Sequence, residues 1–295
     1  MKNAYVEITN ICNLACDFCP GHDRVRRHMT AAEFEKIAKK LNGKIENLFL
    51  HLMGEPLLHP ELKKILGIAD EMDVKLKITT NGTLLPLQQP LLCDCRNLHT
   101  VCISLHSFES NAGGGMAEKK LDTYLTGCLE SASALAKKDK YVVLRLWNLD
   151  KEQKNPQNSL NGIIMEKLQK FFPPTAEEWV KTHRGVRIAT HIFIEWGERF
   201  DWPDISDSKS IFECGYDGEY GSDNCHGLLT QVGILCDGTV VPCCLDRQGD
   251  IPLGNIFKSS LEEILESPRA KAMKEAMAHH RFIEPLCLSC GFKRK

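Results

Sequence analysis

The chain lacks the features that mark a secreted or membrane protein. No apolar run in its 295 residues approaches the length of about 20 residues that a membrane-spanning helix needs. Residues 1–5 do not contain the apolar core of a secretory signal. We therefore expect a cytoplasmic protein.

The sequence also lacks an excess of charge of either sign. Lys and Arg number 37 against 39 Asp and Glu, so the formal net charge is −2. Bulk electrostatics gives no sign of a nucleic-acid or membrane surface, and we expect neither partner. Hydrophobic residues at 43% and charged residues at 26% are the balance of a globular chain. The length suffices for one large domain with a small one.

Cysteine is the residue present in excess. Fourteen cysteines are many for a reducing compartment, where disulfides are rare, so ligation of a metal or cluster is the leading explanation. One group occupies positions 12–19, a second runs from Cys214 to Cys244, and a pair follows at Cys287 and Cys290. We interpret six of the fourteen as ordinary small, mostly buried residues: Cys93, Cys95, Cys102 and Cys128 between the groups, and Cys214 and Cys236 within the second group.

Short β-branched or apolar runs alternate with amphipathic stretches from residue 5 to about residue 196. Strands are predicted at residues 5–9, 47–51, 75–80, 100–105, 141–147 and 191–195, and helices at 30–41, 60–71, 116–138 and 159–172. Repeated β-then-α units imply an α/β fold with parallel strands, either curled into a barrel or left as an open sheet. In both cases the site lies at the carboxyl ends of the strands.

The composition changes near residue 200. Residues 201–210 and 215–227 are polar and rich in turn formers. A hairpin is predicted around Asp237-Gly238, followed by a helix over residues 260–279. We therefore expect a barrel domain over residues 1–200 and a small C-terminal domain over residues 201–295.

Three cysteines directly follow the first predicted strand. Cys12, Cys16 and Cys19 form a C-x3-C-x2-C loop. Three thiolates can hold three irons of a [4Fe–4S] cube and leave the fourth iron open, and an open position distinguishes a reactive centre from a closed structural one. The alternatives are a zinc site or three unrelated buried cysteines, although zinc loops more often use C-x2-C pairs and need a fourth ligand.

With Phe18 placed directly before the third cysteine, this loop resembles the signature of the radical S-adenosylmethionine (SAM) superfamily. The resemblance implies a partial (β/α)6 TIM-like barrel. It continues at residues 53–56, where M-G-E-P is similar to the family's G-G-E-P loop with Met53 replacing the first glycine. Glu55 is thereby implied to bind the amino group of SAM through a charge-assisted hydrogen bond. Residues 79–82, T-T-N-G, match a recurrent turn of the family.

The same resemblance assigns residues near the ends of the later strands. It implies that Ser104 contacts the SAM ribose, that Arg145 binds the SAM carboxylate through its planar guanidinium, and that Ile194 lies in the strand that lines the adenine. Each residue alone is a weak signal, and Glu55 before a proline could be a solvated loop residue. Their joint occurrence in family order supports a SAM site that contains Phe18, Glu55, Ser104, Arg145 and Ile194.

The C-terminal cysteines resemble the SPASM/twitch extension of radical SAM enzymes. Its pattern of a cysteine, a gap and G-x4-C is present as Cys225 and Gly238…Cys243, and a C-x2-C pair follows. The resemblance implies an auxiliary [4Fe–4S] cluster with four ligands, namely Cys225, Cys243, Cys287 and Cys290. Cys244 is the rival of Cys243, and a structural zinc with the same ligands is the alternative. Because only five residues follow Cys290, we expect one auxiliary cluster, as in the shorter twitch type.

These resemblances imply reductive cleavage of SAM to a 5′-deoxyadenosyl radical that takes hydrogen from a substrate carbon. An electron donor such as flavodoxin or ferredoxin is expected. An auxiliary cluster with four cysteine ligands would transfer electrons or support the structure. Only four residues precede the first predicted strand, which leaves no room for a peptide-binding domain, and a small-molecule substrate is favoured.

In size and arrangement the chain resembles the queuine lyases of queuosine salvage, which release the base preQ1 from queuine. No substrate motif supports this choice. His51, His106, Glu195 and Asp201 are candidates, by position only, for contact with the substrate amine. The alternatives are a radical SAM dehydrogenase of an aminocyclitol alcohol, a maturase of ribosomal peptides, and a non-catalytic electron-transfer protein with two clusters. Glu55 and Arg145, which the resemblance assigns to SAM, argue against the last.

Overall fold

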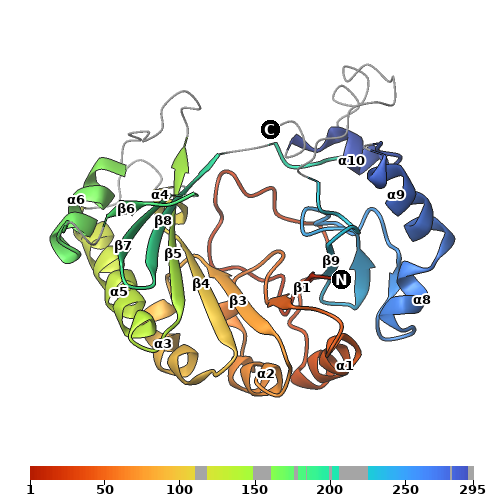
Figure 1. Cartoon of the computed structure of the whole chain (residues 1–295), viewed down its shortest axis with the longest axis horizontal. Helices are drawn as coiled ribbons and strands as arrows, with labels where there is room; N and C mark the ends of the chain where they lie inside the picture. The colour runs from red at the N-terminus through yellow and green to blue at the C-terminus, as the bar shows by residue number, and fades with distance from the viewer. Residues whose placement is uncertain are drawn as a thin grey trace.

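The computed structural model describes residues 1–109, 118–148, 161–175, 179–183, 185–198, 201–205, 225–279 and 281–291. One sheet of 11 strands runs through them in the order β11-β10-β9-β1-β2-β3-β4-β5-β8-β7-β6. The strands are β1 (Asn3–Val6), β2 (Asn47–Phe49), β3 (Lys75–Thr80), β4 (Leu98–Ser104), β5 (Tyr141–Asn148), β6 (Val180–Lys181), β7 (Gly185–Ala189), β8 (Ile192–Glu198), β9 (Gln231–Ile234), β10 (Thr239–Val241) and β11 (Gly254–Asn255). The sheet curves strongly, and helices cover its outer face (Figure 1).

The helices follow the strands in alternation. They are α1 (Ala31–Leu41), a 3-10 turn η1 (Pro56–Leu58), α2 (Leu62–Ala69), α3 (Leu85–Asp94), α4 (His106–Glu109), α5 (Glu118–Ala136), α6 (Asn161–Phe171), α8 (Leu261–Leu265), α9 (Pro268–Ala278) and α10 (Pro285–Ser289). Thr30 caps α1 in the predicted capping box with Glu33. None of the helices in the described residues is long and apolar enough to cross a membrane.

Six parallel strands form the predicted partial barrel. β1 to β5 and then β8 pair in parallel in this order, and the sheet ends at β11 and β6 instead of closing on itself. All six predicted strands exist, and β3 has the predicted bounds. β6 and β7, an antiparallel edge beyond β8, were not predicted, because two short, partly exposed strands carry no clear alternation.

One helix was not predicted, and one predicted helix is divided in the structure. We did not predict α3, which contains Pro90 in its interior, because proline argues against a helix. The helix predicted over residues 260–279 is two helices. Ser267 caps α9, and Pro268 occupies its first turn, so the chain ends α8 before this point and starts again.

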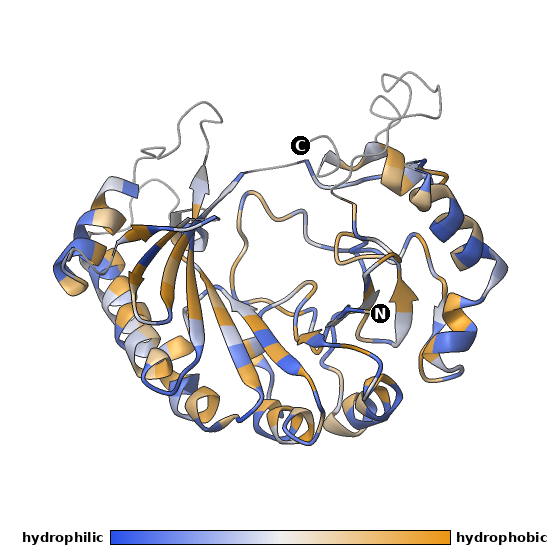
Figure 2. Cartoon of the chain, viewed as in Figure 1, coloured by the Kyte–Doolittle hydropathy of each residue, from blue (hydrophilic) through white to orange (hydrophobic). Residues whose placement is uncertain are grey.

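Alternation along the strands separates an outer apolar face from a more polar inner face. On β5, Val142, Leu144 and Leu146 are fully buried in the core under the helices, so Arg145 and Trp147 face the inside of the barrel. Hydrophilic and hydrophobic bands alternate in the same way along β3 (Figure 2). The inner face therefore presents polar and charged side chains, which suits a binding site better than a packed core.

The C-terminal segment continues the barrel sheet. β9 pairs in parallel with β1, with Tyr5 opposite Gly233, and turns at Asp237-Gly238 into the antiparallel β10. Gly238 has a φ of +84°, which other residues rarely adopt, so the predicted hairpin turn is confirmed. The auxiliary segment is thus joined to the barrel by backbone hydrogen bonds, and the division at residue 200 stays a prediction.

Candidate active site

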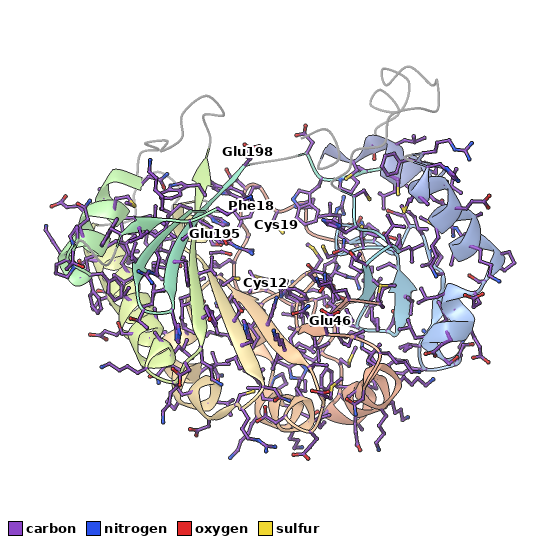
Figure 3. All side chains as sticks on the ribbon, viewed as in Figure 1. Cys12, Phe18, Cys19, Glu46, Glu195 and Glu198 are labelled. Carbon is purple, nitrogen blue, oxygen red and sulfur yellow. The ribbon has the colours of Figure 1, made fainter. Side chains whose placement is uncertain are left out.

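A cavity of about 480 Å³ opens at the carboxyl ends of the strands. Its walls come from the loops that follow β1, β2, β3 and β4. All three cysteines of the first loop line it, together with Phe18, Glu55, His51, Asn81, Ser104, His106 and Trp202. Cys12, Phe18 and Cys19 lie on the inner side of the curved sheet (Figure 3). The structure therefore brings the predicted cluster ligands and three of the predicted SAM contacts to one place.

Glu55 is the most tightly held group of the cavity. Its side chain accepts hydrogen bonds from the Thr80 hydroxyl at 2.8 Å, the Asn81 amide at 2.7 Å and the Leu57 amide at 3.0 Å. Burial raises the pKa of Glu55, and these hydrogen bonds act in the opposite direction. The carboxylate is thus fixed toward the cavity and is not a solvated loop residue. The hydrogen bonds from Thr80 and Asn81 to Glu55 also hold the turn at residues 79–82 at the site.

Gly54 allows the Glu55 loop to touch the cysteine loop. Its φ is +76°, and a Cβ atom at this position would lie 2.4 Å from the carbonyl oxygen of Thr9. The next amide, that of Glu55, donates to the carbonyl of Ile11 at 2.9 Å. No larger residue fits this approach. Met53, the residue before Gly54, is buried and also lines the cavity.

The end of the cysteine loop is anchored by a buried ion pair. Glu7 is fully buried, and the Arg24 guanidinium donates to its two oxygens at 2.6 and 2.7 Å. The amides of Met53 and Cys236 donate to the same carboxylate at 3.2 and 3.1 Å. One carboxylate therefore joins β1, the cysteine loop, the Glu55 loop and the C-terminal hairpin. Glu7 was not predicted as a site residue, although an acidic residue within the first predicted strand is a visible signal.

The three cysteines and their surroundings fit an iron–sulfur cluster. Burial raises the pKa of the Cys12 thiol, and nearby Glu55, Cys16 and Cys19 add to this effect. Such crowding of acidic groups disfavours their ionised forms unless a cationic centre compensates them. The Leu14 amide lies 3.4 Å from the Cys12 sulfur, a donor suited to a thiolate ligand. Soft sulfur donors of this kind suit iron.

The described residues do not form a compact site for a single metal ion. In the parts of the chain that the structure describes, no three His, Cys, Asp or Glu side chains gather closely enough to hold a single ion. A zinc ion binds sulfur at about 2.3 Å and draws its ligands together, whereas a cluster spreads its thiolates over separate irons. This finding therefore concerns a mononuclear site and not a cluster.

Phe18 contributes to an aromatic group at the mouth of the barrel. Its ring lies 5.3 Å from His106 and 5.1 Å from Trp147, and the last two rings are 4.1 Å apart. Ser104 and His106 line the cavity beside it. A flat apolar group such as adenine would find matching surfaces here. The sequence analysis did not foresee the part played by Trp147.

Two predicted SAM contacts lie elsewhere. Ile194 is fully buried in the apolar core, on the opposite face of β8 from Glu195, and its side chain does not line the cavity. The side chain of Ile194 therefore faces away from the cavity, and the expectation that its strand lines the adenine stays a prediction. Arg145 faces the barrel interior but is also absent from the cavity lining, so its contact with the SAM carboxylate stays a prediction.

The second cysteine set gathers beside β1. Burial raises the pKa of Cys243 well above its usual value, with Cys244, Cys287 and Cys290 adding to the rise. The Leu228 amide donates to the carbonyl of Pro242 at 3.0 Å, which brings the segment after Cys225 to the hairpin. Cys290 follows α10 directly, and its amide contacts the carbonyl of Cys287 at 3.4 Å. This neighbourhood fits four thiolates for one cluster; the exact ligand set stays a prediction.

The remaining cysteines behave largely as predicted. Cys95, Cys102, Cys128 and Cys236 are buried, Cys93 is half-buried, and none of the cysteines in the described ranges forms a disulfide. Cys214 lies outside the described residues.

The ligand choice between Cys243 and Cys244 is testable by iron content. Burial raises the pKa of Cys244 to about 11, and a hydrogen bond from the Tyr5 side chain acts in the other direction, so Cys244 faces Tyr5. We expect Cys243→Ala to lose about half of the iron bound by the reconstituted protein. Cys244→Ala is the matched control and should keep all of it. The reverse result would assign Cys244 as the ligand.

Comparison with known families agrees with this geometry. Residues 6–143 match the family model described as the radical SAM superfamily, and residues 225–291 match SPASM, described as an iron–sulfur cluster-binding domain. The probable GTP 3′,8-cyclase of Methanocaldococcus jannaschii is 36% identical over 109 residues, which cover 36% of each chain. The chain thus spans about a third of the length of this relative.

Solved structures share the fold over nearly the whole chain. Native anSMEcpe with bound AdoMet and Cp18Cys peptide has a TM-score of 0.59 at 15% identity, and the match covers 98% of this chain and 88% of that one. BtrN in complex with AdoMet and 2-DOIA has a TM-score of 0.52 at 15% identity, with 98% and 92% covered.

The class is defined by these findings: a partial α/β barrel with a three-cysteine loop, followed by a cysteine-rich hairpin segment. Over residues 6–143 the chain is similar to the radical SAM superfamily, and over residues 225–291 it is similar to iron–sulfur cluster-binding domains of the SPASM type. Domains of these two kinds indicate a [4Fe–4S] cluster, an auxiliary cluster and SAM as cofactors.

Proposed function

We propose that the protein cleaves SAM reductively and uses the resulting radical on a small-molecule substrate. The observation that carries this proposal is the fixed Glu55 carboxylate beside Cys12, Cys16 and Cys19 in one cavity. When bound, the [4Fe–4S] cluster supplies the electron that divides SAM into methionine and a 5′-deoxyadenosyl radical. A two-cluster electron-transfer protein would have no use for a carboxylate held in this way.

The residues of the chain bind and orient in this proposal. Glu55 receives the SAM ammonium, because its carboxylate is already held by three donors and loses little freedom on binding. Phe18 and the rings beside it cover the adenine and exclude water from the reacting carbon. Ser104, at the end of β4 and on the cavity wall, is placed to contact the ribose.

For the substrate we propose queuine, with release of preQ1. Queuine combines a guanine-like base with a secondary amine, and the relative from Methanocaldococcus jannaschii is named for a guanine nucleotide. The inner face of the barrel adds the half-buried carboxylate of Glu195, which suits a protonated amine. Flavodoxin or ferredoxin would deliver the electrons.

The test is anaerobic incubation of the reconstituted protein with SAM, a reductant and queuine, followed by mass detection of products. We expect 5′-deoxyadenosine and preQ1 to form together. Formation of 5′-deoxyadenosine without preQ1 would overturn the queuine proposal and keep the SAM proposal. In that case an aminocyclitol alcohol and a cysteine-containing peptide are the substrates to try next, since proteins of the same fold were solved with 2-DOIA and with a Cys peptide.

A further inference from the structure

Two charged side chains face each other inside the barrel, outside the cavity that holds the SAM residues. Arg145 on β5 and Glu195 on β8 are register partners in parallel strands. Neighbouring strands lie about 4.8 Å apart. Leu144, Leu146 and Ile194, which flank them along the strands, are fully buried on the helix side. Arg145 and Glu195 therefore both project into the interior, where Glu195 appears on the inner side of the sheet (Figure 3).

Neither side chain is satisfied by the protein. Among the described residues no hydrogen bond or ion pair reaches the Arg145 guanidinium or the Glu195 carboxylate, and Arg145 uses only its backbone carbonyl, 3.2 Å from Nδ1 of His106. Both residues are half-buried. Charged groups withdrawn from water are normally paired. Polar groups that converge on an interior without protein partners are available to orient a ligand.

Arg145 acts electrostatically on two side chains of the barrel interior, His51 and Tyr5. Its charge contributes, after burial, to lowering the pKa of His51 to about 3, and it opposes the rise that burial causes in the pKa of Tyr5. The charge of Arg145 is therefore felt by Tyr5 on β1 and by His51 after β2. His51 is one of the residues that line the cavity, so a molecule bound at Arg145 would lie beside bound SAM.

His51 remains neutral in this environment and can form hydrogen bonds without adding charge. Its Nδ1 accepts from the Thr79 amide at 3.3 Å, which leaves the proton on Nε2. The interior thus offers a cation at Arg145, an anion at Glu195 and a neutral donor at His51. An ammonium group and an adjacent carbonyl would match the first two, while a purely anionic or purely apolar substrate would not.

We propose that Arg145 and Glu195 bind the substrate and not SAM: Glu195 receives a protonated amine, and Arg145 receives a carbonyl oxygen next to it. The substrate class is an aminomethyl-substituted, purine-like base. In such a base the amine on the five-membered ring lies beside the carbonyl of the six-membered ring. Two side chains at paired positions on neighbouring strands can bind two such adjacent groups of one ligand. The inference rests on the proposed function and specifies its substrate contacts.

Ligand affinity tests the proposal. We expect Glu195→Gln and Arg145→Met to raise the Kd for queuine about tenfold or more, because each loses a charge-assisted hydrogen bond, and to leave the KM for SAM as in the wild type. Glu46→Gln and Arg96→Met, at exposed positions, are matched controls that should bind queuine normally. Iron content and the circular dichroism spectrum verify that the variants are folded.

An analogue separates the role of the amine from any general damage. 7-Deazaguanine lacks the aminomethyl group, so wild type and Glu195→Gln should bind it equally, and wild type should bind it about tenfold more weakly than preQ1. Equal affinity of the wild type for both bases overturns the inference even if the variants do not fold. A raised KM for SAM with unchanged queuine binding in Arg145→Met also overturns the inference, because Arg145 would then bind SAM and not the substrate. A wild-type protein that binds no queuine contradicts the proposed function itself.

Discussion

Replacement of Cys16 by alanine should abolish the formation of 5′-deoxyadenosine. A [4Fe–4S] cube held by three thiolates loses a third of its protein ligands when one is removed, and Cys16 lines the same cavity as Cys12, Cys19 and Glu55. We expect a loss of at least about a thousandfold, since the cofactor carries the reaction and nothing in the chain can replace it. The measurement is anaerobic turnover of SAM with a strong reductant, followed by chromatography.

Cys93→Ala is the matched control for this experiment. Cys93 is half-buried on α3 and belongs to neither cysteine group of the site. Its replacement should leave both the iron content and SAM cleavage within about twofold of the wild type, as is usual for substitutions away from special features. Retention of SAM cleavage in Cys16→Ala would show that the first loop does not hold the reactive cluster.

The second large effect is expected at Glu7. Glu7→Gln removes one partner of a buried ion pair and leaves Arg24, whose side chain is only 15% exposed, without a counter-charge. Such removal costs about 3–5 kcal/mol. We expect a markedly lower melting temperature of the reconstituted protein and weaker retention of the cluster, because the same carboxylate also holds the amides of Met53 and Cys236. Differential scanning calorimetry under anaerobic conditions measures the first, and iron analysis the second.

An exposed ion pair provides the comparison. Glu35→Gln removes the partner of Lys39 within α1, where the two side chains are 48% and 74% exposed, and should cost about 0.5 kcal/mol or less. If Glu7→Gln and Glu35→Gln lower the melting temperature equally, Glu7 does not anchor the loop. The double variant Glu7→Gln, Arg24→Met should recover part of the loss, since it leaves no unpaired guanidinium.

The sequence predicted what depends on local pattern. Alternating residues located all six barrel strands, and the cysteine spacing located the cavity, where Cys12, Phe18 and Glu55 meet. The face of the sheet that each side chain occupies was harder to predict. A shift of one residue along a strand moves a side chain to the other face of the sheet, and the side chain of Ile194 is buried on the helix side, opposite Glu195.

Hydrogen bonds between residues far apart in the chain could not be predicted from the sequence. Glu7 and Cys236, which share a hydrogen bond, are separated by 229 positions, and no local pattern connects them. The same holds for the fixation of Glu55 by Thr80, which depends on how β2 and β3 are placed side by side. The division of the C-terminal helix could have been foreseen, because Ser267-Pro268 is a regular helix start.

The parallel pairing of β1 with β9 has a consequence for how the protein folds during synthesis. β1 leads into the cysteine loop and is synthesised before β9, so one of its two edges stays unpaired until residues 231–234 are made. Until then the nascent chain presents a bare strand edge next to reactive thiols, a surface prone to aggregation. Cluster insertion after synthesis of the C-terminal segment would avoid both hazards, because Cys236 can contact Glu7 at the loop only once that segment is made.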